Sequence, residues 1–293
     1  MGSDKGYVST LTATLLPPRS KAMNALNQLP PFSPTLSKLL ATLANEDVYF
    51  GELSGVIEKD AVLASHVLKL VNSALYARSG TINSVRHAVS ILGINKLRNV
   101  ALSLSVSRMW KQTKTPKNWS QAAFNLHAVA VAVMCDLLAQ RLRVGYPEGA
   151  FTAGLLHGMG KMMIAIGTPI EYDGILRLYQ ETPTLSMEDA ELHVLGCTHA
   201  ELCTHALAEW KLPVEIQRAV GSQHLTPEPP LTLGGLLFMA HQVVHSLEVS
   251  IPSCNCRAEG TPDRMLCTLG LEDEAERILF EYKAEFDALR AFF

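Results

Sequence analysis

Histidines are the residues of this chain whose side chains and spacing could support metal-dependent chemistry. The sequence has ten histidines, and His157 begins residues 157–161, His-Gly-Met-Gly-Lys, directly after the apolar run 151–156. A neutral imidazole is a common metal ligand, and a bound divalent ion lowers the pKa of a water molecule until it can attack phosphorus. The next residue, Gly158, has no side chain that could bind metal. The segment therefore offers one nitrogen ligand without an adjacent carboxylate.

Two further groups of histidines can be tested against helical geometry. His241 and His245 are four residues apart, as two zinc ligands on one helix are, but Gln242 stands where a metalloprotease has its general-base glutamate. We therefore reject a metalloprotease. The second group recurs every six residues, which turns each side chain by about 240° on a helix, so its members form no stripe and are expected at the surface or at helix caps. They are His193, His199 and His205.

The elements that must position these histidines are predicted to be helices. Ser33 and Pro34 have the N-cap and first-turn pattern and precede leucines at three- and four-residue steps. Asn95 is expected to cap a helix over 96–110, and Ser186 and Asp189 are spaced like a capping box. No stretch shows the two-residue alternation of a strand. The sequence predicts an all-α protein of about a dozen helices. Those expected in the second half lie near 118–143, 147–166, 170–181, 187–209, 213–223, 231–248 and 271–290.

The domain organisation follows from an interruption of the helical pattern at 111–117, a segment that contains threonines and a proline. We expect a helical subdomain on each side of this boundary and less regular segments at both ends of the chain. The predicted parts are an N-terminal arm over 1–21, a helical subdomain over 22–110, a histidine-bearing helical subdomain over 118–248, and a tail over 249–293 with an amphipathic helix.

Composition excludes several classes of protein. With 293 residues, 48% of them hydrophobic, the chain can bury a large core. Its apolar segment 128–139 contains Asp136 and is too short to cross a bilayer, and no charged-then-apolar signal begins the sequence. The six cysteines are too few and too irregular for a disulfide framework, and Cys254, Cys256 and Cys267 lack the spacing of a zinc site. We expect a soluble cytoplasmic protein without membrane contact.

The net charge of −3 conceals two halves of opposite sign. Residues 1–120 carry 14 Lys and Arg against 6 Asp and Glu, whereas residues 121–293 carry 11 against 22. No acidic residue occurs between Asp60 and Asp136. Such a basic stretch would attract a nucleotide, a nucleic acid or an acidic protein face, but it could equally dock on the acidic half of the same chain. The charge pattern alone supports both interpretations.

Several ordered segments together resemble one known family. They are residues 29–31, 39–40, 52–60, 68–76 (Leu-Lys-Leu-Val-Asn-Ser-Ala-Leu-Tyr), 88–93 (Ala-Val-Ser-Ile-Leu-Gly), 97–99 and 151–161. Over roughly 22–248 the chain resembles the HDOD family, which comprises degenerate relatives of the HD and HD-GYP metal-dependent phosphohydrolases. The resemblance implies an all-α, multi-helix HD-like fold, with an N-terminal helical subdomain packed on a degenerate HD-like core. It also implies a bacterial signalling module without demonstrated catalysis.

The resemblance assigns the metal positions of the catalytic relatives to individual residues of this chain. His127 and His157 resemble the first two ligands, while Gly158 replaces the bridging aspartate and His241 stands where the last aspartate falls. Two further histidines resemble the additional ligands of the two-metal relatives. The implied vestigial pocket comprises His127, His157, Gly158, His199, His224 and His241.

This ligand set predicts little or no hydrolysis. A phosphohydrolase uses carboxylate oxygens to bridge two ions and offset their charge, and both positions are lost here. We therefore expect no cofactor. If a divalent metal binds at all, the three imidazoles of His127, His157 and His241 would suit an ion such as zinc.

The function predicted is that of a non-catalytic bacterial signal-transduction module that binds a protein partner or an anionic ligand such as a nucleotide. Two alternatives stay open. One is a residual metal-dependent phosphohydrolase or phosphodiesterase acting on nucleotides, and the other is a nucleic-acid-associated regulator, although few aromatic residues are available for base stacking. The residues expected to contact the anion are Lys96, Arg98, Arg108 and Lys111.

Overall fold

Helices form the regular secondary structure of this protein, and no strand occurs among the residues described. The computed structural model describes residues 17–44, 50–73, 75–76, 81–247, 249 and 260–293. The first seven helices are α1 (Pro18–Asn24), α2 (Pro34–Ala41), α3 (Phe50–Glu58), α4 (Ala61–Val71), α5 (Val85–Leu92), α6 (Ile94–Lys111) and α7 (Gln121–Ala139). They are followed by α8 (Ala150–Leu156), α9 (Met159–Gly167), α10 (Pro169–Glu181), α11 (Met187–Leu195), α12 (His199–Glu209), α13 (Val214–Gly221), α14 (Leu233–Ser246), α15 (Pro262–Thr268) and α16 (Ala275–Arg290). The all-α prediction is confirmed.

Polar residues at the expected N-caps begin two of these helices. The Ser33 hydroxyl accepts a hydrogen bond from the Leu36 amide at 3.1 Å, and Pro34 is the first residue of α2. Ser186 accepts from the Asp189 amide at 3.0 Å and begins α11 in the same way. Each cap satisfies an amide that has no partner inside its own helix. These starts are readable from the sequence because they depend only on local contacts.

The prediction that Asn95 caps α6 is wrong. The helix begins at Ile94, and Gly93 is its N-cap residue with φ of 77°, a left-handed conformation that favours glycine. The Asn95 side chain instead accepts a hydrogen bond from the Arg98 guanidinium at 3.1 Å. Gly93 therefore both ends α5 and precedes α6, so the two helices follow each other without a linker.

The predicted helix over 147–166 is divided into α8 and α9. The division falls at His157 and Gly158, which join the two helices. Because apolar residues continue on both sides, the periodicity of the sequence does not show the break. The consequence is functional, since His157 lies at a junction between two helices rather than inside one.

The predicted helix over 187–209 is likewise divided, into α11 and α12. Gly196 ends α11 with φ of 72°, and the Thr198 hydroxyl begins α12 by accepting from the Glu201 amide at 3.2 Å. His199 is therefore the first residue of α12. It occupies a helix start, as expected for one of the three histidines spaced by six, but its side chain is fully buried rather than at the surface.

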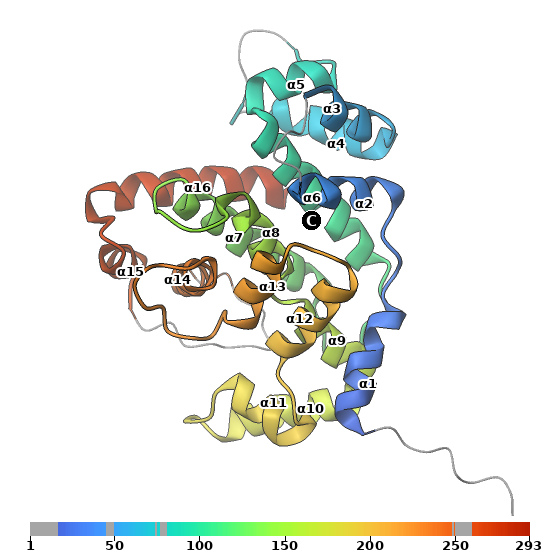
Figure 1. The fold of residues 1–293 in the computed structure, drawn as a ribbon, viewed down its shortest axis with the longest axis vertical. Helices are drawn as coiled ribbons and strands as arrows, with labels where there is room; N and C mark the ends of the chain where they lie inside the picture. The colour runs from blue at the N-terminus through green and yellow to red at the C-terminus, as the bar shows by residue number, and fades with distance from the viewer. Residues whose placement is uncertain (1–16, 45–49, 74, 77–80, 248, 250–259) are drawn as a thin grey trace, which may run out of the picture.

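The central helix of the fold is α7, against which α8, α14 and α16 pack (Figure 1). It is long and apolar enough to cross a membrane, but 72% of the relevant segment is buried inside the fold. A helix that is apolar on all sides is covered either by lipid or by protein, and here other helices cover it. His127 lies in the middle of this buried helix.

The N-terminal helices join the rest of the molecule through α6. On one side α6 contacts α2, α3, α4 and α5, and on the other it contacts α7 and α8. Trp110 near the end of α6 packs edge-on against Phe124 of α7 with ring centroids 5.9 Å apart. The N-terminal helical part therefore packs directly on the histidine-bearing part, as the predicted architecture requires.

The first and last helices also pack on the histidine-bearing part. Helix α1 lies beside α9, where a Cβ added at Gly167 would be 3.0 Å from the carbonyl oxygen of Lys21. Helix α16 runs along α7 and buries Ile278, Tyr282 and Phe286. The described part of the predicted tail, 260–293, is therefore integrated into the core. Cys254 and Cys256, which the sequence analysis rejected as zinc ligands, lie outside the described residues.

Candidate functional site

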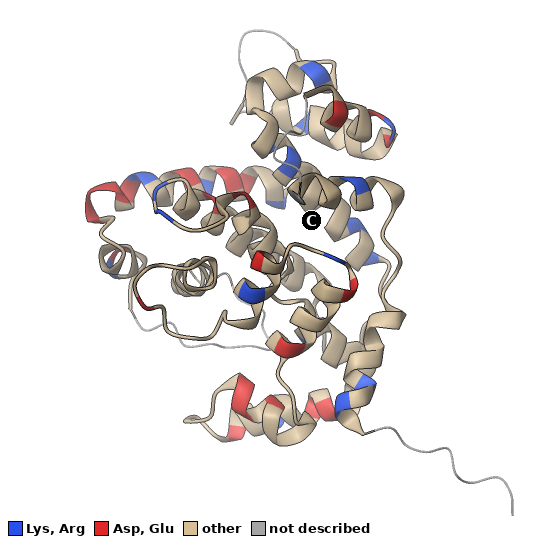
Figure 2. Ribbon diagram, viewed as in Figure 1, with Lys and Arg blue, Asp and Glu red and all other residues tan. Residues whose placement is uncertain are grey.

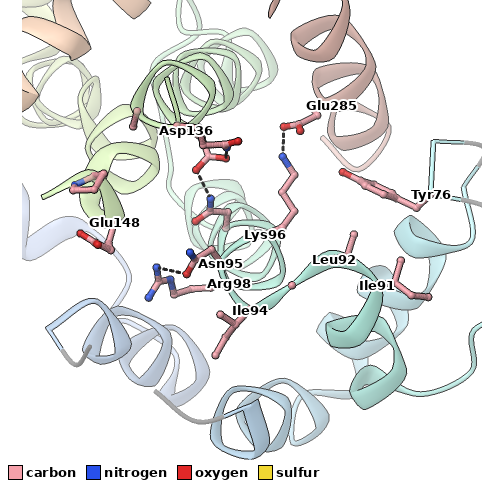
Figure 3. A pocket seen from close by; sticks show the side chains of 15 residues that line it. Tyr76, Ile91, Leu92, Ile94, Asn95, Lys96, Arg98, Asp136, Glu148 and Glu285 are labelled. Carbon is pink, nitrogen blue, oxygen red and sulfur yellow. Dashed lines mark hydrogen bonds and ion pairs between the residues drawn. The ribbon is translucent and has the colours of Figure 1, made fainter. Parts of the chain in front are cut away.

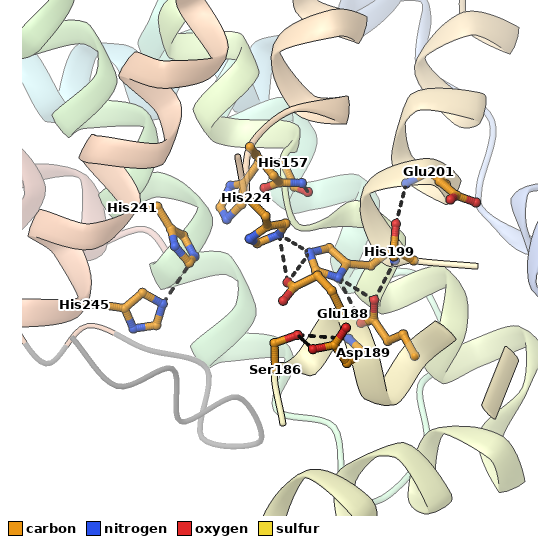
Figure 4. Close-up of polar contacts among 12 residues, drawn as sticks. His157, Ser186, Glu188, Asp189, His199, Glu201, His224, His241 and His245 are labelled. Atoms are coloured by element: carbon orange, nitrogen blue, oxygen red, sulfur yellow. Dashed lines mark hydrogen bonds and ion pairs between the residues drawn. The ribbon is translucent and has the colours of Figure 1, made fainter. Parts of the chain in front are cut away.

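Six imidazoles from five elements of the chain meet in one place, which we call the histidine cluster. Neighbouring rings have centroids between 4.3 and 6.2 Å apart. Figure 4 shows the side chains converging from α14, from the α8–α9 junction, from the start of α12 and from the segment after α13. The members of the cluster are His127, His157, His199, His224, His241 and His245.

Backbone carbonyls orient two of these imidazoles. The Nδ1 of His127 lies 2.8 Å from the carbonyl oxygen of Val249, and the Nδ1 of His157 lies 2.6 Å from that of Gly154. A carbonyl can only accept, so in both rings Nδ1 must carry the proton. The lone pair is then left on Nε2. A hydrogen bond of this kind, which fixes the tautomer of a ring, is the usual arrangement behind metal-binding histidines.

A carboxylate orients His199. The side chain of Glu191 accepts from the His199 backbone amide at 2.7 Å and from Nδ1 at 2.8 Å, and both residues are buried. Burial raises the pKa of Glu191 to about 7, although the positive charge of Lys161 opposes that rise. The Nε2 lone pair of His199 is therefore directed away from Glu191 and into the cluster. This carboxylate–histidine pair is a common support for a bound zinc ion.

The cluster contains two groups of three possible metal ligands. The buried triad consists of His127, His241 and His245, and in it the Nε2 atoms of His241 and His245 are 3.2 Å apart. The acidic triad consists of Glu188, His199 and His224. In the acidic triad, Nε2 of His224 lies 2.8 Å from Nε2 of His199 and 3.1 Å from Oε1 of Glu188. Nε2 of His199 and Oε1 of Glu188 are 3.9 Å apart.

Burial keeps the imidazoles of the cluster neutral. It lowers the pKa of His157 and of His199 to about 3, and that of His245 to about 4. In water the pKa of histidine is about 6.5, so all three rings are uncharged at neutral pH and can use a lone pair to bind metal. Desolvation lowers the pKa of the other members too, namely His127, His224 and His241.

Small residues allow the elements of the cluster to approach. A Cβ added at Gly160 would lie 1.8 Å from the carbonyl oxygen of His199, so α9 and α12 are in backbone contact there. A Cβ at Gly154 would lie 2.7 Å from the Cα of Ala132, which shows the same closeness between α8 and α7. The Sγ of Cys203 donates to the Leu156 carbonyl at 3.1 Å, so α12 also lies close to the end of α8.

Gly158 faces an aromatic ring. A Cβ at this position would lie 3.3 Å from Cε2 of Phe124, closer than ordinary van der Waals contact. Phe124 is itself buried and also contacts Trp110 and Trp119. The position at which the catalytic relatives have a metal-bridging aspartate is therefore both without a side chain and flanked by an aromatic group.

The structure brings together all six residues of the predicted vestigial pocket. Sequence reasoning missed three others that contact them, namely Glu188, Glu191 and His245. The spacing of four between His241 and His245 is the one signal that could have identified His245, although it was set aside with the metalloprotease hypothesis. Glu188 and Glu191 gave no comparable signal, because ordinary acidic residues in the first turns of a helix look the same.

The four predicted anion-binding residues lie in two separate places. Lys96 and Arg98 line a cavity of about 570 Å³ between α6, α7 and α16, and in it Lys96 forms an ion pair with Glu285 (Figure 3). Arg98 is largely buried, and burial lowers its pKa. Arg108 and Lys111 lie together at a different cavity, beside α4. The four residues therefore do not form one continuous surface.

Several basic residues of the first half already form ion pairs or hydrogen bonds within the chain. Arg108 binds both carboxylate oxygens of Asp60, at 3.2 and 2.5 Å, and these hydrogen bonds lower the pKa of Asp60. Lys111 donates to the Phe292 carbonyl at 3.3 Å. Basic and acidic residues are intermixed along α16, as Figure 2 shows. Within the described part of the chain, three ion pairs join the basic first half to the acidic second half, namely Arg19–Glu201, Lys21–Glu171 and Lys96–Glu285.

The helical fold and the positions of the clustered histidines define an HD-related protein. The model of the HDOD domain matches residues 29–226, which is more than half of the sequence. The chain belongs to the HDOD domain family. The resemblance stated from the sequence is therefore confirmed, as is the HD-like helical fold that it implied.

Solved structures share this fold over nearly the whole chain. An HDOD domain protein of unknown function from Geobacter sulfurreducens has a TM-score of 0.73 at 21% identity, covering 93% of this chain and 97% of that one. A protein from Shewanella amazonensis, provisionally named a phosphohydrolase, has a TM-score of 0.71 at 24% identity, covering 92% and 98%. At these identities the likeness shows the fold alone.

Two relatives are longer than this chain. A Marinobacter aquaeolei protein, provisionally named a signal transduction protein, has a TM-score of 0.71 at 21% identity, and the match covers 94% of this chain and 65% of that one. An uncharacterized protein of Treponema pallidum is 23% identical over 212 residues, which are 70% of this chain and 39% of the relative. The chain therefore spans less than two thirds of each.

Proposed function

We propose that this chain is a non-catalytic HDOD signalling module that acts by binding a protein partner and does not cleave phosphoesters. One observation carries the proposal: Gly158 replaces the metal-bridging aspartate, and Phe124 lies where the missing side chain would need room. A hydrolytic ion pair needs a shared anionic ligand to hold two positive ions close together. Restoring such a ligand would require a carboxylate to be added and the Phe124 ring to shift by a few tenths of an ångström.

The remaining acidic groups do not replace the lost aspartate in this proposal. Glu191 is engaged by His199 through two hydrogen bonds, so its oxygens point away from the other rings. Glu188 belongs to the acidic triad, and the buried triad has only nitrogen ligands. Three neutral imidazoles can hold one ion, but they leave its two positive charges uncompensated.

A phosphodiesterase assay tests the absence of hydrolysis. The protein would be incubated with manganese and either bis(p-nitrophenyl) phosphate or a cyclic dinucleotide. The variant His157→Ala removes a cluster member, and His193→Ala serves as the control because His193 is an exposed histidine on α11. We expect the wild type, His157→Ala and His193→Ala to be equally inactive. Turnover by the wild type that survives in His193→Ala and disappears in His157→Ala would overturn the proposal.

A protein partner is favoured over a polyanion because internal contacts engage the candidate basic residues. Lys96 is paired with Glu285, and Arg108 with Asp60, so binding a phosphate would have to break an existing ion pair. Retention on heparin tests this choice, because polyanion binding weakens steeply as salt rises. We expect weak retention that Lys111→Glu does not change. Strong, salt-dependent retention that Lys111→Glu reduces would favour the nucleic-acid alternative.

A further inference from the structure

A groove of about 860 Å³ lies between three segments of the histidine-bearing part, namely the connection from α7 to α8, helix α13 and the residues around the start of α14. It is open to solvent, and none of its lining residues belongs to the histidine cluster. The apolar residues that line it are Val144, Tyr146, Ala219, Pro230, Leu231 and Leu233. A groove of this size can accept several neighbouring side chains of a partner.

Two arginines that line this groove have no partner in the described part of the chain. Arg143 and Arg218 are exposed, and neither guanidinium group forms a hydrogen bond or an ion pair with a described residue. Glu215 is the one acidic residue among the described lining residues, so the groove carries an excess of one positive charge. A guanidinium group binds a carboxylate through two parallel hydrogen bonds, so the two free arginines favour an acidic partner.

We propose that this groove binds an acidic segment of the partner protein, in which carboxylates flank apolar side chains. The apolar lining buries those apolar side chains, and Arg143 and Arg218 bind the carboxylates. A nucleic acid fits the groove less well, because two free cations neutralise few phosphates and an apolar lining gives the phosphate backbone no contacts. The inference rests on the proposed function, since it names the surface and the kind of partner for the same binding role.

Tyr146 connects the groove to the N-terminal helical part. Its φ of 62° lies in the left-handed region, which residues other than glycine adopt rarely. Its hydroxyl donates to the Leu43 carbonyl at 2.5 Å, and Leu43 lies in the short helix Thr42–Ala44, directly after α2. An occupant of the groove therefore contacts a residue that is held by both helical parts of the molecule.

Selection from a phage library of random peptides tests the groove without a known partner. The full chain would be immobilised, and the enriched peptides would be synthesised with a fluorescein label and titrated by fluorescence polarisation. We expect the enriched sequences to combine Asp or Glu with Leu, Phe or Trp. Arg143→Glu and Arg218→Glu should each weaken binding at least about tenfold. The control Arg177→Glu should leave it unchanged, because Arg177 is an exposed arginine on α10, outside the groove.

Hydrogen exchange of the wild-type chain gives a second measurement that needs no variant. A bound peptide should slow amide exchange in 143–146, in α13 and in 231–234. Slowing confined to other segments, or binding that Arg143→Glu and Arg218→Glu both leave unchanged, would overturn the groove as the site while leaving a protein-binding function in place. Enrichment of basic peptides, or of none, would overturn it as well. Turnover in the phosphodiesterase assay would instead contradict the proposed function, independently of the peptide result.

Discussion

Replacing Gly160 by alanine should destabilise the fold at the point where α9 meets α12. The added carbon would lie 1.8 Å from the carbonyl oxygen of His199 and 2.7 Å from its carbonyl carbon. Ordinary contacts of this kind are above about 3.3 Å, so the helices would have to move apart by more than about 1 Å. Both contacts are with backbone, so no side-chain rotation can relieve them. Overpacking typically costs about 1–3 kcal/mol, and we expect about 3 kcal/mol of lost unfolding free energy.

Urea denaturation followed by circular dichroism would measure this loss. Gly174→Ala is the matched control, because Gly174 lies inside α10 and an added Cβ there meets nothing within 4 Å. Alanine favours a helix over glycine by about 0.5–1 kcal/mol, so the control should become more stable. The two substitutions should therefore have opposite signs. A Gly160→Ala protein within about 0.5 kcal/mol of the wild type, beside a stabilised control, would refute the packing argument.

Two further predictions concern a salt bridge and acid stability. Arg141→Ala should cost about 1–2 kcal/mol because Arg141 is nearly buried between Glu274 and Glu281, whereas exposed Arg277→Ala should cost under about 0.5 kcal/mol in the same denaturation assay. In metal-free protein, burial lowers the pKa of His157 from about 6.5 in the unfolded chain to about 3 in the folded protein. Between these two pH values the unfolded chain binds more protons than the folded protein, so the free energy of unfolding decreases as the pH is lowered. Between pH 7 and pH 5 this histidine should account for about 2 kcal/mol of the loss, which His157→Asn should abolish in denaturation measurements at both pH values.

The sequence predicted the fold well because helix starts and amphipathic faces depend on nearby residues. Ser33 and Ser186 cap α2 and α11 as expected. The break at His157 and Gly158 could not be predicted in this way, because the apolar pattern continues through it. The break between α11 and α12 does carry local signals, a glycine C-cap at Gly196 and a threonine N-cap at Thr198, which the prediction from periodicity overlooked.

Only the residues of the site that match the family pattern were predicted from the sequence. The pattern identified the inherited histidine positions but not Glu188, whose Oε1 lies 3.1 Å from Nε2 of His224. The charge pattern failed to show which cations have internal partners, because Lys96 and Glu285 are nearly two hundred residues apart in sequence. Contacts between segments that are distant in sequence therefore decide which side chains join the histidine cluster and which cations lack an internal partner. Residue types alone do not.

The most direct test of the account measures metal content and phosphodiesterase turnover on the same manganese- or zinc-loaded sample. We predict fewer than two ions per chain together with no turnover above that of His157→Ala. Two ions per chain with turnover that His157→Ala abolishes would contradict the account, because it would mean that a hydrolytic ion pair assembles despite Gly158.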